Sequence, residues 1–237
     1  MAASPPSAPT KPTLIHLQNS SSQSALWVLE ELEIDYDLRL FPRPQGRAPP
    51  ELKETHPQGK SPQLLLPSGR VITQLSAIVL YLIRTYDTSH TFSSPENDPV
   101  REEMLLGIGG TDLASKLGSK LMLHGVALLS PFFIRPLLNR VRKFLNELVL
   151  DPDIAACFDV LESELGAQEW FMGGTAPSRV DFVVHFFVGL AVQPGYVHLE
   201  KYKGLKAWME RCEARPAWKR ALERGNGYDL DYPRQWA

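Results

Sequence analysis

The chain has few cysteines, little net charge and no long apolar run, and each of these shortages excludes a class of protein. Its two cysteines, Cys157 and Cys212, lie far apart and in no metal-type spacing, so we interpret them as ordinary thiols in a reducing compartment and expect no metal. The formal net charge of −2 gives no support to nucleic-acid binding. No run of about 18 apolar residues predicts an integral membrane span, and residues 1–12 lack the apolar core of a signal peptide. We therefore expect a cytoplasmic location.

Local composition divides the chain into five parts. Residues 1–12 are rich in Pro, Ala and Ser, which predicts a disordered lead-in. Residues 88–99 carry Asp, Ser, Thr, Asn and two prolines, a composition typical of a linker. The remainder splits into a first domain at residues 13–87, a second at residues 100–225 and a polar tail at residues 226–237.

The first domain alternates strand and helix patterns. Thr13–Gln18 is rich in apolar and β-branched residues, and it is followed by leucines at helical spacing and by a second strand pattern at Asp35–Phe41. The tripeptide PSG at 67–69 marks a tight turn between two short strands, which predicts a hairpin, and Gln74–Tyr86 has helical periodicity. Strand–helix–strand followed by strand–strand–helix is the order of a thioredoxin-like α/β domain.

The second domain shows helical periodicity without a strand pattern, which predicts an all-α domain. Gly107, Gly109 and Gly110 interrupt its first helix, at a cost of about 1 kcal/mol each relative to alanine. We interpret them either as a bent or widened wall facing a bulky hydrophobic substrate or as a local helix break without functional meaning. The predicted helices are Val100–His124, Phe132–Leu148, Ile154–Gly166, Ser178–Gly189, Tyr202–Cys212 and Ala217–Arg224.

Four stretches of sequence, in their order and separation, resemble the glutathione transferases. They read NSSSQSALWVLEEL from Asn19, APPELKETHPQGKSPQL from Ala48, PFFIRPLLNRVRKFL from Pro131 and WFMGGTAPSRVDF from Trp170. The third is similar to the fungal branch that includes the yeast membrane-associated transferase. The resemblance covers about residues 13–225 and implies the glutathione-transferase fold, an α/β thioredoxin-like N-terminal domain followed by an all-α C-terminal domain.

The resemblance implies that the turn beginning at Asn19 activates the sulfur of glutathione, the expected co-substrate. A thiol has a pKa of about 8.5, and lowering that pKa by about two requires about 2.7 kcal/mol of preferential thiolate binding. A hydroxyl or amide N–H at the start of a helix, helped by the helix dipole, can supply this. By register with the family Ser20 is the first candidate, and Asn19 and Ser21 are the alternatives. Plain N-capping by these side chains is compatible with each choice.

Ser61 and Pro62 come directly before a predicted strand. A cis peptide bond between them would turn the N–H and C=O of Ser61 into a cleft. The resemblance implies that these two groups hold the peptide backbone of glutathione as if it were an added strand. It also makes Lys60 a candidate partner for the glycine carboxylate of glutathione, with His56 as a weaker candidate.

The segment at Gln74 and Leu75 departs from the pattern of the family. The family has an acidic or amide residue followed by serine here, and the two bind the γ-glutamyl end of glutathione. Gln74 fits the first place, whereas Leu75 keeps the backbone N–H but lacks the hydroxyl. A hydrogen bond to a charged group is worth about 1.5–3 kcal/mol, so the affinity is expected to fall by more than about tenfold. We therefore expect an altered glutathione site.

Ser178 and Asp181 have the spacing of a capping box at the start of a helix. The serine satisfies a first-turn N–H and the carboxylate reaches back to the cap. The pair also matches the buried capping box of the family. We assign both residues to folding rather than to catalysis.

The function expected from the resemblance is conjugation of glutathione to a hydrophobic electrophile, in a homodimer and as part of fungal secondary metabolism. Two alternatives keep the fold. One is a glutathione-independent isomerase, cyclase or lyase that acts on a biosynthetic intermediate, and Leu75 and the glycine-rich helix motivate it. The other is a non-catalytic binding protein, since a fold does not fix a function.

Overall fold

The structure is a computed structural model that describes residues 11–93 and 98–236. The expected lead-in therefore lies almost wholly outside the described residues, and so do residues 94–97 of the expected linker. The described chain forms two compact units. The α/β unit contains the residues up to Tyr86 together with Ala217–Tyr228, and the helical unit contains the residues from Asp87 to Pro216 and those from Asp229 onward.

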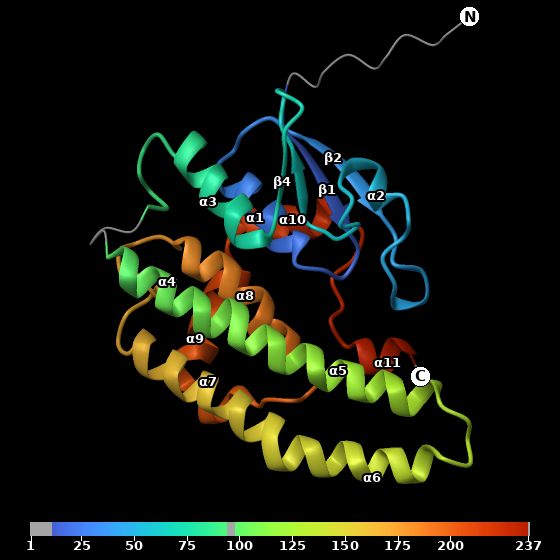
Figure 1. Cartoon of the computed structure of the whole chain (residues 1–237). Helices are drawn as coiled ribbons and strands as arrows, with labels where there is room; N and C mark the ends of the chain where they lie inside the picture. The colour runs from blue at the N-terminus through green and yellow to red at the C-terminus, as the bar shows by residue number, and fades with distance from the viewer. Residues whose placement is uncertain (1–10, 94–97, 237) are drawn as a thin grey trace, which may run out of the picture. The chain divides into compact units, whose positions relative to one another are not determined.

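The α/β unit is built on a four-stranded sheet with strand order β2-β1-β3-β4 (Figure 1). The strand β1 pairs with β2 in parallel and with β3 antiparallel, and β3 pairs antiparallel with β4. This mixed sheet confirms the predicted thioredoxin-like order. The strands are β1 (Thr13–Leu17), β2 (Asp37–Phe41), β3 (Gln63–Leu65) and β4 (Val71–Thr73).

Helices cover this sheet. The buried face of α1 carries Trp27, which packs edge-on against Trp218 of α10 with ring centroids 5.4 Å apart. The helices of the unit are α1 (Ser22–Glu31), α2 (Leu52–Thr55), α3 (Leu75–Tyr86) and α10 (Pro216–Arg224), with a short 3₁₀ turn η1 (Pro44–Gly46).

The C-terminal segment Ala217–Tyr228 belongs to the α/β unit, whereas the sequence prediction placed residues 100–225 in the helical domain. The physical reason is a buried carboxylate. Glu30 of α1 accepts hydrogen bonds from the Tyr36 hydroxyl, from Arg220 Nε at 3.0 Å and from Arg224 at 2.8 Å. Burial acts to raise the pKa of Glu30, but these partners outweigh it and hold the pKa below its usual range. The ion pairs therefore fasten α10 to α1.

The helical unit confirms the predicted all-α domain (Figure 1). None of its described helices is both long and apolar enough to cross a membrane. The elements are α4 (Pro99–Gly107), the π-helical η2 (Ile108–Asp112), α5 (Leu113–Leu129), α6 (Arg135–Leu145), the π-helical η3 (Asn146–Leu150), α7 (Asp151–Leu165), α8 (Arg179–Val192), the 3₁₀ turn η4 (Leu199–Lys201), α9 (Lys203–Ala214) and α11 (Tyr232–Trp236).

The glycine-rich segment does not break the helix. The chain passes from α4 through η2 into α5 without interruption. A Cβ on Gly109 would lie 2.6 Å from Val184 Cγ2, and one on Gly110 would lie 3.2 Å from Val183 Cγ1. The glycines at these two positions therefore let η2 approach the buried helix α8 closely, which is a packing reason that local sequence does not reveal.

The capping box of α8 is present and fully buried. The Asp181 carboxylate accepts hydrogen bonds from Ser178 N–H at 2.7 Å and from the Ser178 hydroxyl at 2.6 Å. It also accepts from Phe171 N–H at 3.1 Å and from Trp208 Nε1 at 2.8 Å. Burial raises the pKa of Asp181, and these four bonds oppose that rise. The carboxylate therefore joins three segments of the helical unit.

Residues 226–237 were expected to be a polar tail, but their described part is largely ordered. Leu230 and Tyr232 are buried, and α11 begins at Tyr232. Leu230 N–H donates to Gln193 Oε1 at 2.8 Å. The tail has structure because these apolar side chains pack within the helical unit, although the surrounding sequence is polar.

Candidate functional site

The strand register of the α/β unit brings three chain segments to one edge of the sheet. Ile15 pairs with Gln63, and Gln63 pairs with Thr73. The end of β1, the start of β3 and the end of β4 therefore share an edge. Ser61 and Leu75 each lie two residues beyond the last β3–β4 pair. Since β1 and β4 flank β3, the end of β1 and the end of β4 are about 10 Å apart, which is about the length of an extended tripeptide.

The loop that follows β1 is held together by two serine hydroxyls. Ser20 Oγ donates to Leu17 O at 2.8 Å and lies 2.7 Å from Ser22 Oγ. Ser22 Oγ donates to the same carbonyl at 3.1 Å and accepts from Leu17 N–H at 3.1 Å. Both serines are buried. The first predicted catalytic candidate, Ser20, thus has its hydroxyl committed to the loop itself.

Asn19 and Ser21, the two alternative candidates, differ in their surroundings. Asn19 is buried in the left-handed region at φ 53°, a conformation that asparagine tolerates better than most residues. Its N–H donates to Gly227 O at 3.3 Å. Ser21 is half-buried at the N-cap of α1, and its side chain makes no capping hydrogen bond. Among the three candidates Ser21 has the hydroxyl that is most accessible and least committed.

The Ser61–Pro62 peptide bond is cis, as the sequence suggested. Ser61 Oγ donates to Ile15 O at 3.2 Å, which fixes the residue against β1. Within the described residues neither the N–H nor the C=O of Ser61 has a hydrogen-bond partner. These two backbone groups leave an open place for an extended strand at the edge of the sheet.

Lys60 and His56 lie on the loop before Ser61. Lys60 is exposed, and its ammonium makes no ion pair with any residue that the structure describes. His56 is half-buried, and its Nδ1 accepts from Gln58 N–H at 3.3 Å. Lys60 is therefore the cation of this loop that is available to an anionic group.

Gln74 and Leu75 form the turn between β4 and α3. Gln74 is exposed and has φ 73°, a left-handed conformation that is unfavourable for glutamine and is often found where a ligand is held. Leu75 is buried, and its N–H is one of the first-turn donors that have no partner inside a helix. At the position where the family has serine, this chain therefore has a buried leucine side chain next to a backbone N–H that has no partner within the helix.

Other residues that support this edge were not predicted from the sequence. Gln63 Nε2 donates to Leu52 O at 3.0 Å and to Lys60 O at 2.8 Å, which fastens the preceding loop to β3. Arg43 Nε donates to Gln18 O at 3.0 Å. In the sequence, the one sign of this role was the polar Gln63 at the start of an otherwise apolar strand.

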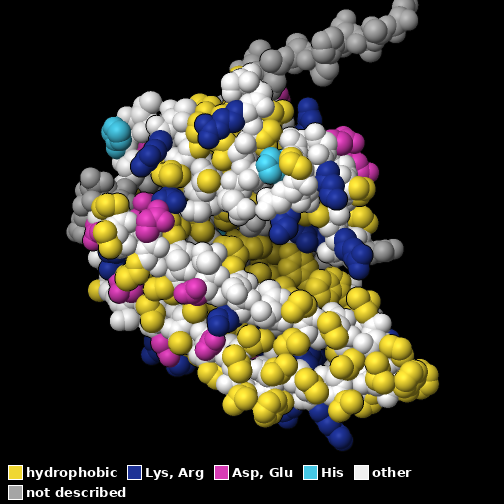
Figure 2. All heavy atoms as spheres, in the orientation of Figure 1, with side chains coloured by type: hydrophobic (Ala, Val, Ile, Leu, Met, Phe, Trp, Pro, Cys, Tyr) yellow, Lys and Arg dark blue, Asp and Glu magenta, His cyan; other side chains and the backbone are white. Residues whose placement is uncertain are grey.

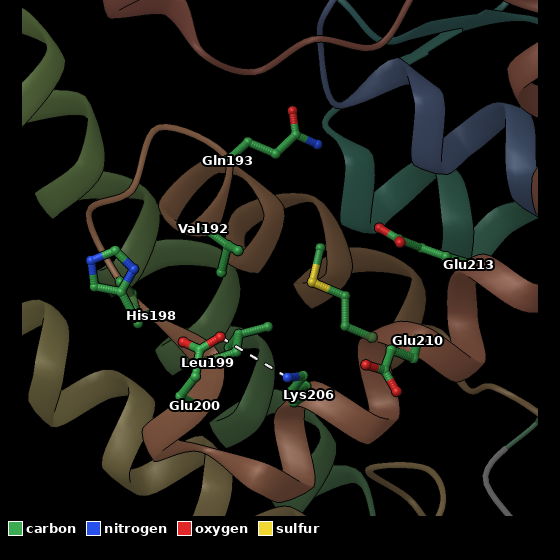
Figure 3. Close-up of a pocket in the computed structure, with 10 residues that line it drawn as sticks. Val192, Gln193, His198, Leu199, Glu200, Lys206, Glu210 and Glu213 are labelled. Atoms are coloured by element: carbon green, nitrogen blue, oxygen red, sulfur yellow. Dashed lines mark ion pairs between the residues drawn. The ribbon is translucent and has the colours of Figure 1, made fainter.

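A cavity lies in the helical unit, and none of the predicted site residues lines it (Figure 3). It has a volume of about 470 Å³. Burial and the neighbouring Glu210 raise the pKa of Glu213 in its wall, and Lys206 pairs with Glu200 at 4.0 Å. The described residues contain no group of three or more His, Cys, Asp and Glu side chains that could hold a metal ion. The lining is Val192, Gln193, Val197, His198, Leu199, Glu200, Lys206, Met209, Glu210 and Glu213.

Comparisons with known proteins agree with this geometry. The family model "Glutathione S-transferase, N-terminal domain" matches residues 20–85, and the model "Glutathione S-transferase, C-terminal domain" matches residues 129–216. Glutathione S-transferase 3 of Schizosaccharomyces pombe is 29% identical over 89% of this chain and 86% of its own length. Glutathione S-transferase 1 of Saccharomyces cerevisiae is 23% identical over 91% and 96%.

Solved structures are similar over nearly the whole chain. A glutathione S-transferase from Actinobacillus pleuropneumoniae has a TM-score of 0.71 and 27% identity, with 94% of this chain and 96% of that one covered. The glutathione transferase URE2P8 from Phanerochaete chrysosporium, solved with oxidised glutathione, has a TM-score of 0.69 and 23% identity, with 90% and 94% covered. The first structure is similar in both fold and sequence, whereas the second shows similarity of fold alone.

Proposed function

Since the chain belongs to the glutathione S-transferase family and is a transferase of that type, we propose that it conjugates glutathione to a hydrophobic electrophile. The observation that carries this proposal is the set of open backbone groups at Ser61 and Leu75 on one edge of the sheet. These groups lie on two neighbouring strands, so one extended peptide can reach both. The similar protein URE2P8 was solved with oxidised glutathione, which supports a glutathione site on this fold.

We propose that glutathione lies along this edge as an added strand. The N–H and C=O of Ser61, next to the cis Pro62, pair with its cysteinyl backbone. Lys60 pairs with the glycine carboxylate, and His56 lies on the same loop. The Gln74 side chain and the Leu75 N–H at the start of α3 bind the γ-glutamyl end, where the positive end of the helix dipole favours a carboxylate.

We propose Ser21 as the hydroxyl that donates to the thiolate. Support comes from its half-buried N-cap position and from its lack of a capping bond. Ser20 and Asn19 then serve to hold the loop in shape. The thiolate sulfur attacks an electrophilic carbon and a C–S bond forms. The displaced electron pair leaves with the leaving group or enters the conjugated acceptor, and the thiol proton passes to solvent.

The setting of this reaction is a further part of the proposal. Both curated relatives come from yeasts, which supports a fungal origin. The altered position at Leu75 suits a specialised enzyme of secondary metabolism. We propose a cytoplasmic location, with which the free thiols of Cys157 and Cys212 are compatible.

Leu75 favours the alternative in which the protein is an enzyme that does not use glutathione. If the missing hydroxyl raises the dissociation constant for glutathione above the cellular concentration of glutathione, the protein does not bind it in the cell. The same site then serves a glutathione-independent isomerase, cyclase or lyase. If the protein turns over no substrate at all, it is a non-catalytic binding protein.

Calorimetric titration with glutathione, paired with a conjugation assay on a standard electrophile, tests the proposal. We expect sub-millimolar binding that weakens by about tenfold in Lys60→Gln, because a charge-assisted hydrogen bond is lost. Lys219→Gln is the matched control, since it removes the same charge from an exposed position of the same unit. Absence of both binding and conjugation would favour the glutathione-independent alternatives.

We infer that the functional form is a homodimer, which is the typical state of this family. Hydrophobic side chains gather over α6 and the end of α5 (Figure 2), and no residue of α6 is buried. Phe132 and Phe133 are 80% and 70% exposed. A continuous apolar face of this kind is typical of an interaction surface. Its other large apolar members are Met122, Val126, Leu129, Ile134, Leu137, Val141, Phe144, Leu148 and Val149.

Light scattering after size exclusion tests the dimer. We expect a mass of twice 26.6 kDa for the native chain and a shift toward the monomer in a Phe133→Ser and Leu137→Ser double variant. Val100→Ser, at a 78% exposed position away from α6, is the control. A monomeric native chain would refute the inference.

A further inference from the structure

Two buried side chains and one half-buried side chain of the α/β unit carry buried polar atoms that have no partner within 3.5 Å among the described residues. His16 of β1 is 0% exposed and Gln23 of α1 is 1% exposed. Both ring nitrogens of His16, both amide atoms of Gln23 and Oδ1 of Asn226 find no hydrogen-bond partner among the described protein residues. Buried polar groups in folded proteins are nearly always hydrogen-bonded, so this cluster requires an explanation.

Gln23 and His16 approach Gly225 closely. A Cβ placed on Gly225 would lie 2.9 Å from Gln23 Oε1, 3.1 Å from Ala221 O and 3.5 Å from His16 Nε2. Gly225 does not have a positive φ, so its backbone conformation does not require glycine there. The lack of a side chain at this position therefore lets Gln23 and His16 approach the returning C-terminal segment closely, where it passes β1 and α1.

The chemistry of the cluster suits a water molecule. Burial lowers the pKa of His16 to about 4, while weak hydrogen bonding from the Ser22 backbone and the Asn226 side chain, neither within 3.5 Å, acts in the opposite direction. The ring is therefore neutral near pH 7 and offers one donor and one acceptor. The Gln23 amide offers both kinds, and Asn226 Oδ1 accepts because Nδ2 already donates to Phe41 O at 3.0 Å. A buried water with two to four such partners is a common structural element.

The cluster brackets the loop that carries the proposed thiolate donor. His16 comes directly before Leu17, whose N–H and C=O bind the two buried serines. Gln23 comes directly after Ser22. Asn226 comes directly before Gly227, whose carbonyl accepts from Asn19 N–H. A bridge among the three side chains therefore fixes both ends of the loop and the segment that crosses it.

We propose that His16, Gln23 and Asn226 hold a buried water molecule and that this hydrated cluster positions the loop from Gln18 to Ser22. The three side chains are positioning residues, because they touch neither the sulfur nor the electrophile. The link to thiol activation rests on the proposed function, whereas the water and the loop order do not.

Two variants test the proposal. Gly225→Ala places a methyl group 2.9 Å from Gln23 Oε1 and so displaces that amide, and Gln23→Met removes the amide at similar size. Gly118→Ala is the matched control, since a Cβ there meets no atom within 4 Å. We expect a crystal structure of the native chain to show a water bonded to His16 and Gln23, and the same structure of Gly225→Ala to lack it. We expect hydrogen exchange at the Asn19 amide to become about tenfold faster in both variants but not in the control.

The thiol supplies a readout that a purely structural role would not move. Ultraviolet titration of bound glutathione should give a thiol pKa raised by about one in both variants, a tenfold loss of thiolate preference. A direct Gln23–His16 hydrogen bond without water, or unchanged Asn19 exchange in both variants, would overturn the proposal. If native protein binds no glutathione, the proposed function fails, and the water and the exchange rates still decide this inference.

Discussion

The two sides of the candidate site are built in opposite ways. On the β1 side, the hydroxyls of Ser20 and Ser22 are buried and bonded to Leu17. On the β3–β4 side, the backbone groups of Ser61 and the first-turn N–H of Leu75 are open. The comparison teaches that a cluster of serines is by itself no sign of catalysis. Hydroxyls can hold a loop in shape while the plain backbone offers the binding groups.

The stability of the β1 side should depend on pH through His16. The pKa of His16 is lowered from 6.5 to about 4, so the unfolded chain binds a proton more readily than the folded one between these values. The stabilisation is present above about pH 6.5 and is lost as the pH falls toward 4, a change of about 3 kcal/mol. Denaturant unfolding followed across this range should show that His16→Asn has a shallower pH dependence than the native chain.

His185 sharpens this expectation, because burial lowers its pKa to about 3 in the helical unit. Protonation of His185 should therefore continue to lower the free energy of unfolding of the protein below the pH at which His16 is fully charged. Equal pH dependence in His16→Asn and the native chain would show that the histidine of the β1 side is not the acid-sensitive group.

Replacing single serines should separate structure from chemistry in the loop. Ser20→Ala removes the hydrogen bonds to Leu17 O and Ser22 Oγ, so the free energy of unfolding should fall by about 1–2 kcal/mol. Ser21→Ala breaks no capping bond and should change stability by no more than about 0.5 kcal/mol, while the thiol pKa of bound glutathione rises. Denaturant titration and thiolate absorbance measure the two effects. The reverse pattern would return the catalytic role to Ser20.

Much of the fold follows from local sequence. The hairpin at β3 and β4 rests on a tight turn, and the capping box of Ser178 and Asp181 rests on a fixed spacing, so both were predictable. The membership of Ala217–Tyr228 in the α/β unit was not, because it depends on Glu30 meeting two arginines about 190 positions later in the chain. The packing of Gly109 against Val184 is non-local in the same way.

The candidate site was predictable to a lesser degree. The resemblance gave the residues at the edge of the sheet, including the open backbone at Ser61 and the altered position at Leu75. It did not give the direction in which each serine hydroxyl points. That depends on the loop conformation, which is set by Asn19 at a positive φ and by its bond to Gly227 from the far end of the chain.

Restoring a serine at position 75 should strengthen the open side of the comparison. Leu75→Ser adds a hydroxyl at the first position of α3, beside a free N–H, so glutathione should bind about tenfold more tightly. Because Leu75 is only 7% exposed, the same change should lower the free energy of unfolding by about 2–3 kcal/mol through lost apolar burial. Leu40→Ser, at a 45% exposed position of β2, is the matched control for the chemical change and should alter neither glutathione affinity nor stability by a comparable amount. Calorimetric titration with glutathione measures the affinity. An unchanged dissociation constant in Leu75→Ser would show that the γ-glutamyl end binds through the backbone N–H and Gln74 alone, so that the missing hydroxyl does not set the affinity of this site.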